Sequence, residues 1–310
     1  MTKRLLDANA SDFAAMTARQ IVEGIRLSEG RLVAAEVIAS APPLIDKVSN
    51  PELAASMGAD LILLNFYDVT APQVCGLPAE NAAADSKIFG RFPSGLGVTL
   101  RQVKAWIGRL VGLNLEPIEN PEAMSSSGRL ATAENARLAV EQGADFIVVT
   151  GNPHTGVTSQ GICRSAALIR AGVGDKVVLL AGKMHAAGAG GATLSPDDLR
   201  QLAQAGADGI LLPAPGTVPG MTVEAAHALI DTAHELGLLA MNTVGTSQEG
   251  ASQSTIEQLA LWSKMTGADI HHLGDAGTVG IAVPENIYAW SLALRGRRHT
   301  WHRMAASLKR

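Results

Sequence analysis

The sequence predicts an α/β protein of the (β/α)8 barrel class, a single domain over residues 1–310. Short apolar runs of the kind found in buried strands alternate with longer segments of helical periodicity. The tripeptide Gly-Ala-Asp stands at four of the joints between a helix and the next strand, beginning at Gly58, Gly143, Gly206 and Gly267. A chain of 310 residues that is 47% hydrophobic is long enough for one such barrel, which takes roughly 250 residues.

The chain begins with a helix before its first strand. Residues 12–29 carry apolar side chains at helical spacing, among them Phe13 and Ile21, and the pattern ends near Gly30. We expect this N-terminal segment, 1–30, to close the bottom of the barrel.

Eight strands follow, each with a helix after it, and this order favours a closed barrel over an open doubly wound sheet. The expected strands are 32–38, 61–66, 112–117, 145–150, 177–181, 210–213, 238–244 and 270–273. The expected helices are 51–57, 99–110, 132–142, 161–171, a helix that starts at Ser195-Pro196, 222–236, 254–265 and 284–294.

Two segments interrupt this regularity. Residues 67–98 are rich in proline and glycine and too long for an ordinary connection, so we expect a lid over the site or a small insertion. Residues 295–310 form a basic tail, which is either the solvated end of the last helix or a contact within a homo-oligomer.

Composition excludes several classes of partner. The net charge of −4 provides no basic surface for nucleic acid, and no apolar run approaches the ~20 residues of a membrane span. Cys75 and Cys163 stand far apart in no metal-ligand spacing, and the N-terminus lacks the apolar core of a signal peptide, so we expect a cytoplasmic protein. The glycine-rich stretch 188–191 does not open a helix directly after a strand, so no nucleotide cofactor is expected.

Active sites of these barrels lie at the carboxyl ends of the strands, and this rule separates the polar residues into two groups. Asp60, Asp145, Asp208 and Asp269 stand at strand entrances, where a structural role is expected. The residues at or just beyond strand exits are Glu36, Asn65, Asp68, Asn114, Glu116, Asn152, His154, Lys183, His185, Asn242 and Asp275.

Among the second group we predict catalytic roles for Glu36, Glu116, Lys183, His185, His154, Asn65 and Asn152. The carboxylate of Glu36 lies in an apolar run and therefore needs a partner. Lys183 follows an apolar strand, where it would serve as a clamp for substrate charge, as an ion-pair partner or as a Schiff-base nucleophile. The two histidines suit acid–base catalysis near neutral pH, although a surface loop position remains an equal alternative.

Strand alternation assigns several of these side chains to faces. Asn114 and Glu116 share one face, and Lys183 and His185 share another. If Asn65 points inward, His272 points inward as well and His271 faces the helices.

Two glycine-rich loops predict an anion site. Backbone N–H groups of Gly245, Thr246, Ser247, Gly274, Ala276 and Gly277 would bind a phosphate or carboxylate; the alternative is two tight turns that need glycine. Asp275 would repel a phosphate there unless it points away or holds a metal, and Glu249 raises the same conflict. If a divalent metal such as Mg²⁺ is present, Glu36, Glu116 and Asp275 are its predicted ligands.

The segment Gly143 to Gly156 (GADFIVVTGNPHTG) resembles the fourth-strand segment of the BtpA family, barrels associated with photosystem I assembly or found beside sugar-transport genes. This resemblance implies that Thr150, Gly151, Thr155 and Gly156 form part of the site. The chain also resembles phosphoenolpyruvate phosphonomutase-like proteins, but it lacks their clustered aspartates, and Gly182-Lys-Met-His185 only loosely matches their Lys-Lys-Cys-Gly-His motif.

These features predict an enzyme that acts on a small phosphorylated or carboxylated metabolite, as a lyase, aldolase or isomerase. The alternative is a non-catalytic binding or assembly protein, which the BtpA resemblance permits.

Overall fold

The computed structural model describes residues 2–79, 87–88, 90–118, 126–152, 156–185 and 194–310. In this part of the chain, eight parallel strands form a closed barrel with the order β1-β10-β9-β8-β7-β6-β5-β2, as the sequence predicted. Its strands are β1 (Leu32–Ile38), β2 (Leu61–Asn65), β5 (Leu110–Leu115), β6 (Phe146–Val149), β7 (Val178–Gly182), β8 (Gly209–Pro213), β9 (Leu239–Val244) and β10 (Ile270–Leu273).

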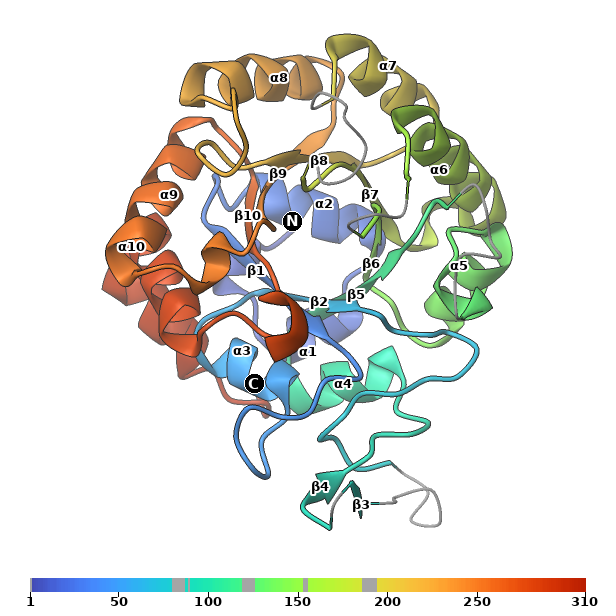
Figure 1. Ribbon diagram of the computed structural model, residues 1–310, viewed down its shortest axis with the longest axis vertical. Coiled ribbons are helices and arrows are strands. Elements are labelled where there is room, and N and C mark those ends of the chain that lie inside the picture. The colour runs from blue at the N-terminus through green and yellow to red at the C-terminus, as the bar shows by residue number, and fades with distance from the viewer. Residues whose placement is uncertain (1, 80–86, 89, 119–125, 153–155, 186–193) are drawn as a thin grey trace.

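A helix follows each barrel strand, and together the helices surround the sheet (Figure 1). They are α3 (Asn50–Ser56), α4 (Leu100–Ile107), α5 (Ala133–Glu141), α6 (Ser159–Val173), α7 (Pro196–Gln204), α8 (Val223–Glu235), α9 (Gln253–Met265) and α10 (Pro284–Met304). Because both faces of the sheet are buried, the strands read as continuous apolar runs, which is why their bounds were predictable to within about two residues.

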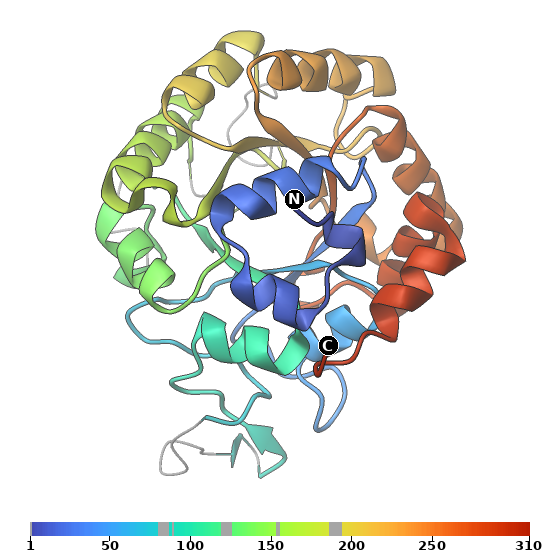
Figure 2. The same cartoon turned by 180° about the vertical axis from the view of Figure 1, so that it is seen from behind.

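The N-terminal segment is two short helices where one was expected. After a 3₁₀ turn at Leu5–Asp7, α1 (Ala10–Ala15) ends at Met16, whose backbone is extended, and Thr17 caps the start of α2 (Ala18–Arg26). Phe13 and Ile21 belong to a buried apolar cluster that also contains inward-facing strand residues such as Leu32. Seen from behind, these helices lie across the amino-terminal opening of the barrel (Figure 2).

Each of the four Gly-Ala-Asp aspartates links the entrance of its own strand to that of the preceding strand. Each carboxylate accepts a backbone N–H of the preceding strand at 2.8–2.9 Å, as Asp60 does from Val33. Each also contacts a basic side chain, and for Asp208 this is Arg170 at 2.6 Å. Their structural assignment therefore agrees with the contacts at the bottom of the barrel.

The end of the chain differs from the expected solvated tail. Helix α10 continues past a kink at Gly296 to Met304. Arg295 and Arg303 are buried and lie 2.6 and 2.7 Å from the carboxylate of Asp60, so these two arginines hold the last helix against the bottom of the barrel.

Residues 67–98 were expected to form a lid or an insertion. Their described part contains a two-stranded ribbon of β3 (Lys87–Ile88) and β4 (Phe92–Pro93), which projects beyond α4 at the outside of the barrel (Figure 1). No described residue of this segment lines the cavity at the centre of the barrel.

Candidate functional site

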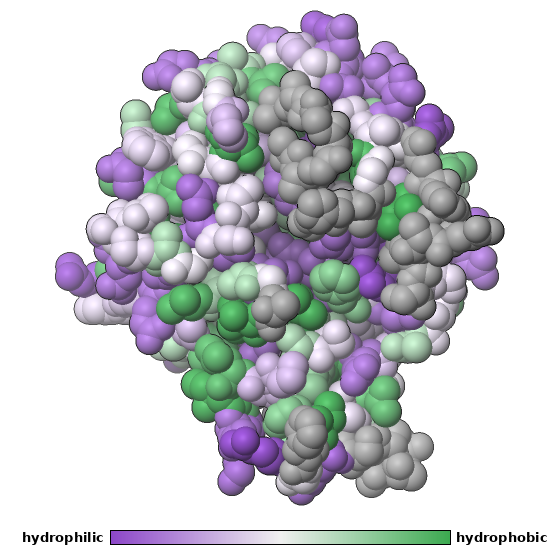
Figure 3. All heavy atoms as spheres, in the orientation of Figure 1, coloured by the Kyte–Doolittle hydropathy of each residue, from purple (hydrophilic) through white to green (hydrophobic). Residues whose placement is uncertain are grey.

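A cavity of about 410 Å³ opens at the carboxyl ends of the strands, where barrels of this class carry their active sites. Its described lining comes from seven of the eight strand ends or the loops that follow them. In the space-filling view from this side, polar side chains lie in a recess near the centre of the face (Figure 3).

Strand alternation explains why polar side chains meet here. On each strand the lower inward positions are apolar and belong to the buried cluster above the N-terminal helices, as in Leu32 and Ala34 of β1. Several inward positions nearer the carboxyl ends are polar. Glu36, Asn65, Asn114 and His272 lie within the strands, and Thr150 follows directly after β6. The cavity floor is therefore polar although the barrel below it is apolar.

Asp275 lies at the centre of a hydrogen-bonding group. It follows β10, and its two carboxylate oxygens accept the backbone N–H of Gly277 at 2.8 Å and the side-chain N–H of Asn65 at 3.1 Å. Asn65 also donates to Asn152 at 3.0 Å. Burial, followed by the nearby charge of Glu36, raises the pKa of Asp275 to about 7. Its carboxyl group is consequently able to exchange a proton near neutral pH.

Glu36 and His272 form a buried pair on neighbouring strands β1 and β10. Their Oε2 and Nε2 atoms lie 3.0 Å apart, and His272 is fully buried. The contact is not a hydrogen bond, and both ring nitrogens lack a hydrogen-bonding partner among the described residues. The inward direction of His272 agrees with strand alternation.

His271, next in the strand, faces the other way as expected. Its Nε2 donates to the carbonyl of Gly30 at 3.0 Å and its Nδ1 accepts from Ser263 at 2.7 Å. Burial lowers its pKa to about 4, so it stays neutral and serves the packing between strand and helices. Asn242 likewise points to the helix layer, where it donates to Thr266 at 2.8 Å.

Two of the six N–H groups that were expected to bind an anion are engaged by carboxylates. The N–H of Ala276 donates to Glu249 at 3.2 Å, and the N–H of Gly277 donates to Asp275. Gly245, Ser247, Gly274 and Gly277 line the cavity, whereas Thr246 and Ala276 are not among its described lining residues. The hydroxyl of Thr246 is hydrogen-bonded to Thr217 and Gln248. The N–H groups of Ala276 and Gly277 are thus not directed at an external phosphate.

Glu116 is buried but does not line the cavity in the described structure. It is paired with Arg129, whose guanidinium stacks 4.0 Å above the ring of Phe66. Among the described residues, no group of three His, Cys, Asp or Glu side chains is placed to hold a metal ion. Glu36, Glu116 and Asp275 therefore do not assemble into the predicted metal site there.

Lys183 and His185 do not behave as a pair. Strand β7 ends at Gly182, so period-two alternation does not extend to them. Met184 and His185 line the cavity, whereas Lys183 is absent from its described lining. His154 and Thr155 lie outside the described residues, while Thr150 and Gly151 line the cavity and Gly156 does not.

Backbone strain gathers at the same place. Five described residues other than glycine have positive φ, and three of them, Phe66, Ser247 and Ala276, directly follow a strand end or belong to the loops after β9 and β10. Such conformations cost about 1–3 kcal/mol each and concentrate at functional sites. Phe66 and Glu249 were not among the predicted site residues; Phe66 carries no local signal, and Glu249 was recognised only as an obstacle to phosphate.

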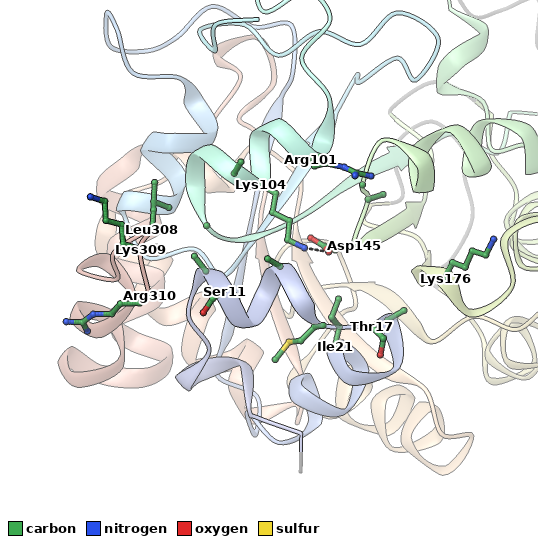
Figure 4. Close-up of a pocket in the computed structure, with 18 of the residues that line it drawn as sticks. Ser11, Thr17, Ile21, Arg101, Lys104, Asp145, Lys176, Leu308, Lys309 and Arg310 are labelled. Atoms are coloured by element: carbon green, nitrogen blue, oxygen red, sulfur yellow. Dashed lines mark hydrogen bonds and ion pairs between the residues drawn. The ribbon is translucent and has the colours of Figure 1, made fainter. Parts of the chain in front are cut away.

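A second cavity of about 900 Å³ lies at the opposite end, between α1, α2, α4 and residues 308–310. There Lys104 points to Asp145, and Lys176, Lys309 and Arg310 lie spread around the opening (Figure 4). Since Asp145 is occupied as a strand anchor, we place the candidate site at the carboxyl end of the barrel despite the smaller volume.

The fold and the position of the cavity define a (β/α)8 barrel with a polar site at the carboxyl ends of its strands. The chain belongs to the family described as Domain of unknown function (DUF7916), whose model matches residues 6–310. No curated protein sequence matches it. None of the helices in the described part of the chain has the length and apolar character needed to cross a membrane.

Solved structures with a similar backbone include three archaeal proteins. Thiamine phosphate pyrophosphorylase from Pyrococcus furiosus is 11% identical over 86% of this chain and 97% of its own, with a TM-score of 0.46. Orotidine 5'-phosphate decarboxylase from Pyrococcus horikoshii is 15% identical over 86% and 100%, with a TM-score of 0.47. Deoxyribose phosphate aldolase from Aeropyrum pernix is 14% identical over 84% and 90%, with a TM-score of 0.46. At these identities the likeness concerns the fold alone.

Proposed function

We propose that this protein is an enzyme that moves a proton on a small polar metabolite, as a lyase or isomerase, in the cavity at the carboxyl ends of the strands. One observation carries the proposal: the carboxylate of Asp275 is held by Asn65 and Gly277 inside a polar cavity, with the carboxylates of Glu36 and Glu249 close by. This is the arrangement that makes a carboxyl group an acid–base catalyst near neutral pH.

In the proposed reaction, the Asp275 carboxylate removes a proton from a carbon beside a carbonyl group, and the bonding electrons move onto the carbonyl oxygen. An isomerase returns that proton to a neighbouring atom, whereas a lyase uses it to protonate a departing group. The side chains of Asn114, Asn152 and His185 line the same cavity, and the amide of Asn114 would hydrogen-bond a polar group of the substrate.

The anionic substrate group expected from the sequence, a phosphate or a carboxylate, is not part of this proposal. The N–H groups that were to bind it at Ala276 and Gly277 already serve Glu249 and Asp275. A phosphate placed there would also meet carboxylate charge, which is unfavourable in a partly buried site.

Exchange with heavy water tests the proposal without knowledge of the substrate. The protein is incubated in D₂O with mixtures of small hydroxy, oxo and amino acids and their phosphates, and mass spectrometry follows deuterium uptake and new products. We expect uptake into, or conversion of, one class of compound, and a loss of at least ~100-fold in rate for Asp275→Asn, which is the lower range for removing a general acid–base group.

Ligand binding in the same mixtures, with neither exchange nor conversion, would identify a binding protein instead. A rate that is unaffected in Asp275→Asn would remove this residue from the reaction. Asp231→Asn, a change of the same type on the outer helix α8, serves as the control.

A further inference from the structure

We infer that the cavity binds its small-molecule ligand through a protonated amine that donates to the buried carboxylate of Glu249, while Glu36 and Asp275 add negative charge to the same cavity. As a statement about substrate, this inference rests on the function proposed above, because it names the chemical class on which that site would act.

The charge of the cavity supports a cationic ligand. Three carboxylates, from Glu36, Glu249 and Asp275, are among the described residues that line it, and these lining residues include no lysine or arginine. The segments outside the described residues contain neither residue type in their sequence. Complementary charge is the general basis of selectivity between ligands of similar size.

A buried oxygen without a partner marks where the amine would bind. Glu249 is 3% exposed and lines the cavity. Its Oε1 accepts the N–H of Ala276, but its buried Oε2 has no hydrogen-bond partner among the described residues. An unsatisfied buried acceptor is unfavourable, and more so when it is charged, so a donor brought by a ligand would be strongly favoured.

The three carboxylates reach the cavity from different elements. Glu36 comes from β1, Glu249 from the 3₁₀ turn Gln248–Gly250, and Asp275 from the loop after β10. All three line the one cavity, and after burial the charges of Glu36 and Glu249 contribute to the raised pKa of Asp275. An ammonium group has three N–H donors and so matches several separate acceptors.

A bare metal ion and an anion fit less well. A metal needs its ligands to converge on one point, and no described group of three His, Cys, Asp or Glu side chains does so. An anion would find the N–H groups of Ala276 and Gly277 already engaged by Glu249 and Asp275.

A set of probes with one carbon skeleton tests the inference. The full chain is titrated in a calorimeter with 2-aminoethanol, ethylene glycol and glycolate, which are respectively cationic, neutral and anionic at neutral pH, and separately with MgCl₂ and inorganic phosphate. We expect 2-aminoethanol to bind at least ~10-fold more tightly than the other two organic probes, which corresponds to about 1.4 kcal/mol.

The variant Glu249→Gln keeps an oxygen for the N–H of Ala276 and removes one charge. We expect it to lose the preference for 2-aminoethanol, whereas Glu257→Gln, the same change on the exposed side of α9, retains it. Thermal melting of both variants checks their fold. If Glu249→Gln does not fold, the comparison of probes on the natural protein decides the matter.

Equal affinity for the three organic probes, tighter binding of glycolate or phosphate, or a response to MgCl₂ alone would each overturn the inference. The probes require no turnover. An amine preference in a protein without deuterium exchange would therefore contradict the proposed enzyme and support the amine site. Deuterium exchange without an amine preference would support the enzyme and contradict the amine site.

Discussion

Burial determines the chemistry of individual carboxylates in this protein. Asp275 is partly shielded from water and lies near Glu36 and Glu249, which makes its ionised form less favourable than in the unfolded chain. Glu249 is affected in the same direction, since burial raises its pKa. Neither effect follows from the residue type, because both depend on neighbours that come from other strands.

We predict that Asp275→Asn changes the pH dependence of stability. Because the pKa of Asp275 is raised by folding, to about 7, this residue favours the folded state below pH 4 and loses that contribution as the pH rises to 7. The rise of this pKa from about 4 to about 7 corresponds to roughly 4 kcal/mol as an upper bound, which Asp275 shares with the neighbouring carboxylates of Glu36 and Glu249. Between pH 4.5 and 8 the free energy of unfolding should therefore fall less in the variant.

Urea denaturation at several pH values measures this difference. Glu257→Gln, on the exposed side of α9, should keep the natural pH profile. Identical profiles for the natural protein and Asp275→Asn would show that Asp275 titrates normally in the fold.

Lys183 provides a second prediction about a single side chain. It follows Gly182 and is not among the described residues that line the cavity, so we expect Lys183→Ala to keep any activity within about threefold. Borohydride reduction in the presence of a converted substrate should add no mass at this residue. A covalent adduct, or a loss of 100-fold or more, would place Lys183 in the reaction after all.

At the level of strands and helices, the repeated aspartates are not equivalent. Asp60 is completely buried and meets both Arg295 and Arg303, whereas the side chain of Asp208 is 31% exposed and meets Arg170 near the surface. Burial and the two arginines act in opposite directions on Asp60, and its pKa is lowered on balance. The aspartate of the same motif therefore contributes differently to stability at different strand entrances.

Replacing these aspartates with asparagine measures the difference. In Asp60→Asn the acceptor for Val33 N–H remains, but two buried guanidinium groups lose their counter-ion, so we expect a loss of about 3–5 kcal/mol in the free energy of unfolding. Asp208→Asn also keeps its backbone contact to Leu179 and should lose about 1 kcal/mol or less. Chemical denaturation of both variants gives the comparison, and equal losses would contradict the explanation.

For the molecule as a whole, the two ends of the barrel differ in polarity and in access to solvent. The lower interior is apolar and is closed by α1 and α2 together with residues such as Leu5 and Phe13, while the upper interior is polar and open. Substitutions at the apolar end should therefore change stability without changing ligand binding.

Phe13→Ala tests this separation. Phe13 is fully buried, and removal of such a ring typically destabilises a protein by about 3–5 kcal/mol. We expect that loss in denaturant, with unchanged affinity for 2-aminoethanol under conditions where the variant is folded. Leu168→Ala, at a position that is 59% exposed on α6, should change stability by less than about 0.5 kcal/mol. A large fall in affinity for Phe13→Ala would show that the two ends are coupled.

The amino-acid pattern was sufficient for the barrel, for the closing N-terminal helices and for the strand bounds, because periodicity and capping act within a few residues along the chain. It also located Glu36, Asn65 and Asp275 at strand exits, where the structure brings them into one cavity. It did not reveal that Met16 would break the first helix or that Gly108, in the left-handed conformation, would end α4 early and let β5 begin at Leu110.

Contacts between residues far apart in the sequence determine which partners the charged and polar side chains have. Glu116 pairs with Arg129, and Arg303 of the basic tail is buried against Asp60. The N–H groups of Ala276 and Gly277 donate to Glu249 and Asp275. In each case, burial and distance in the folded structure determine which charged or polar group is the partner. Local sequence therefore determines where strands, helices and polar strand ends occur, and only the closed barrel determines which of those polar groups meet and what charge the site presents.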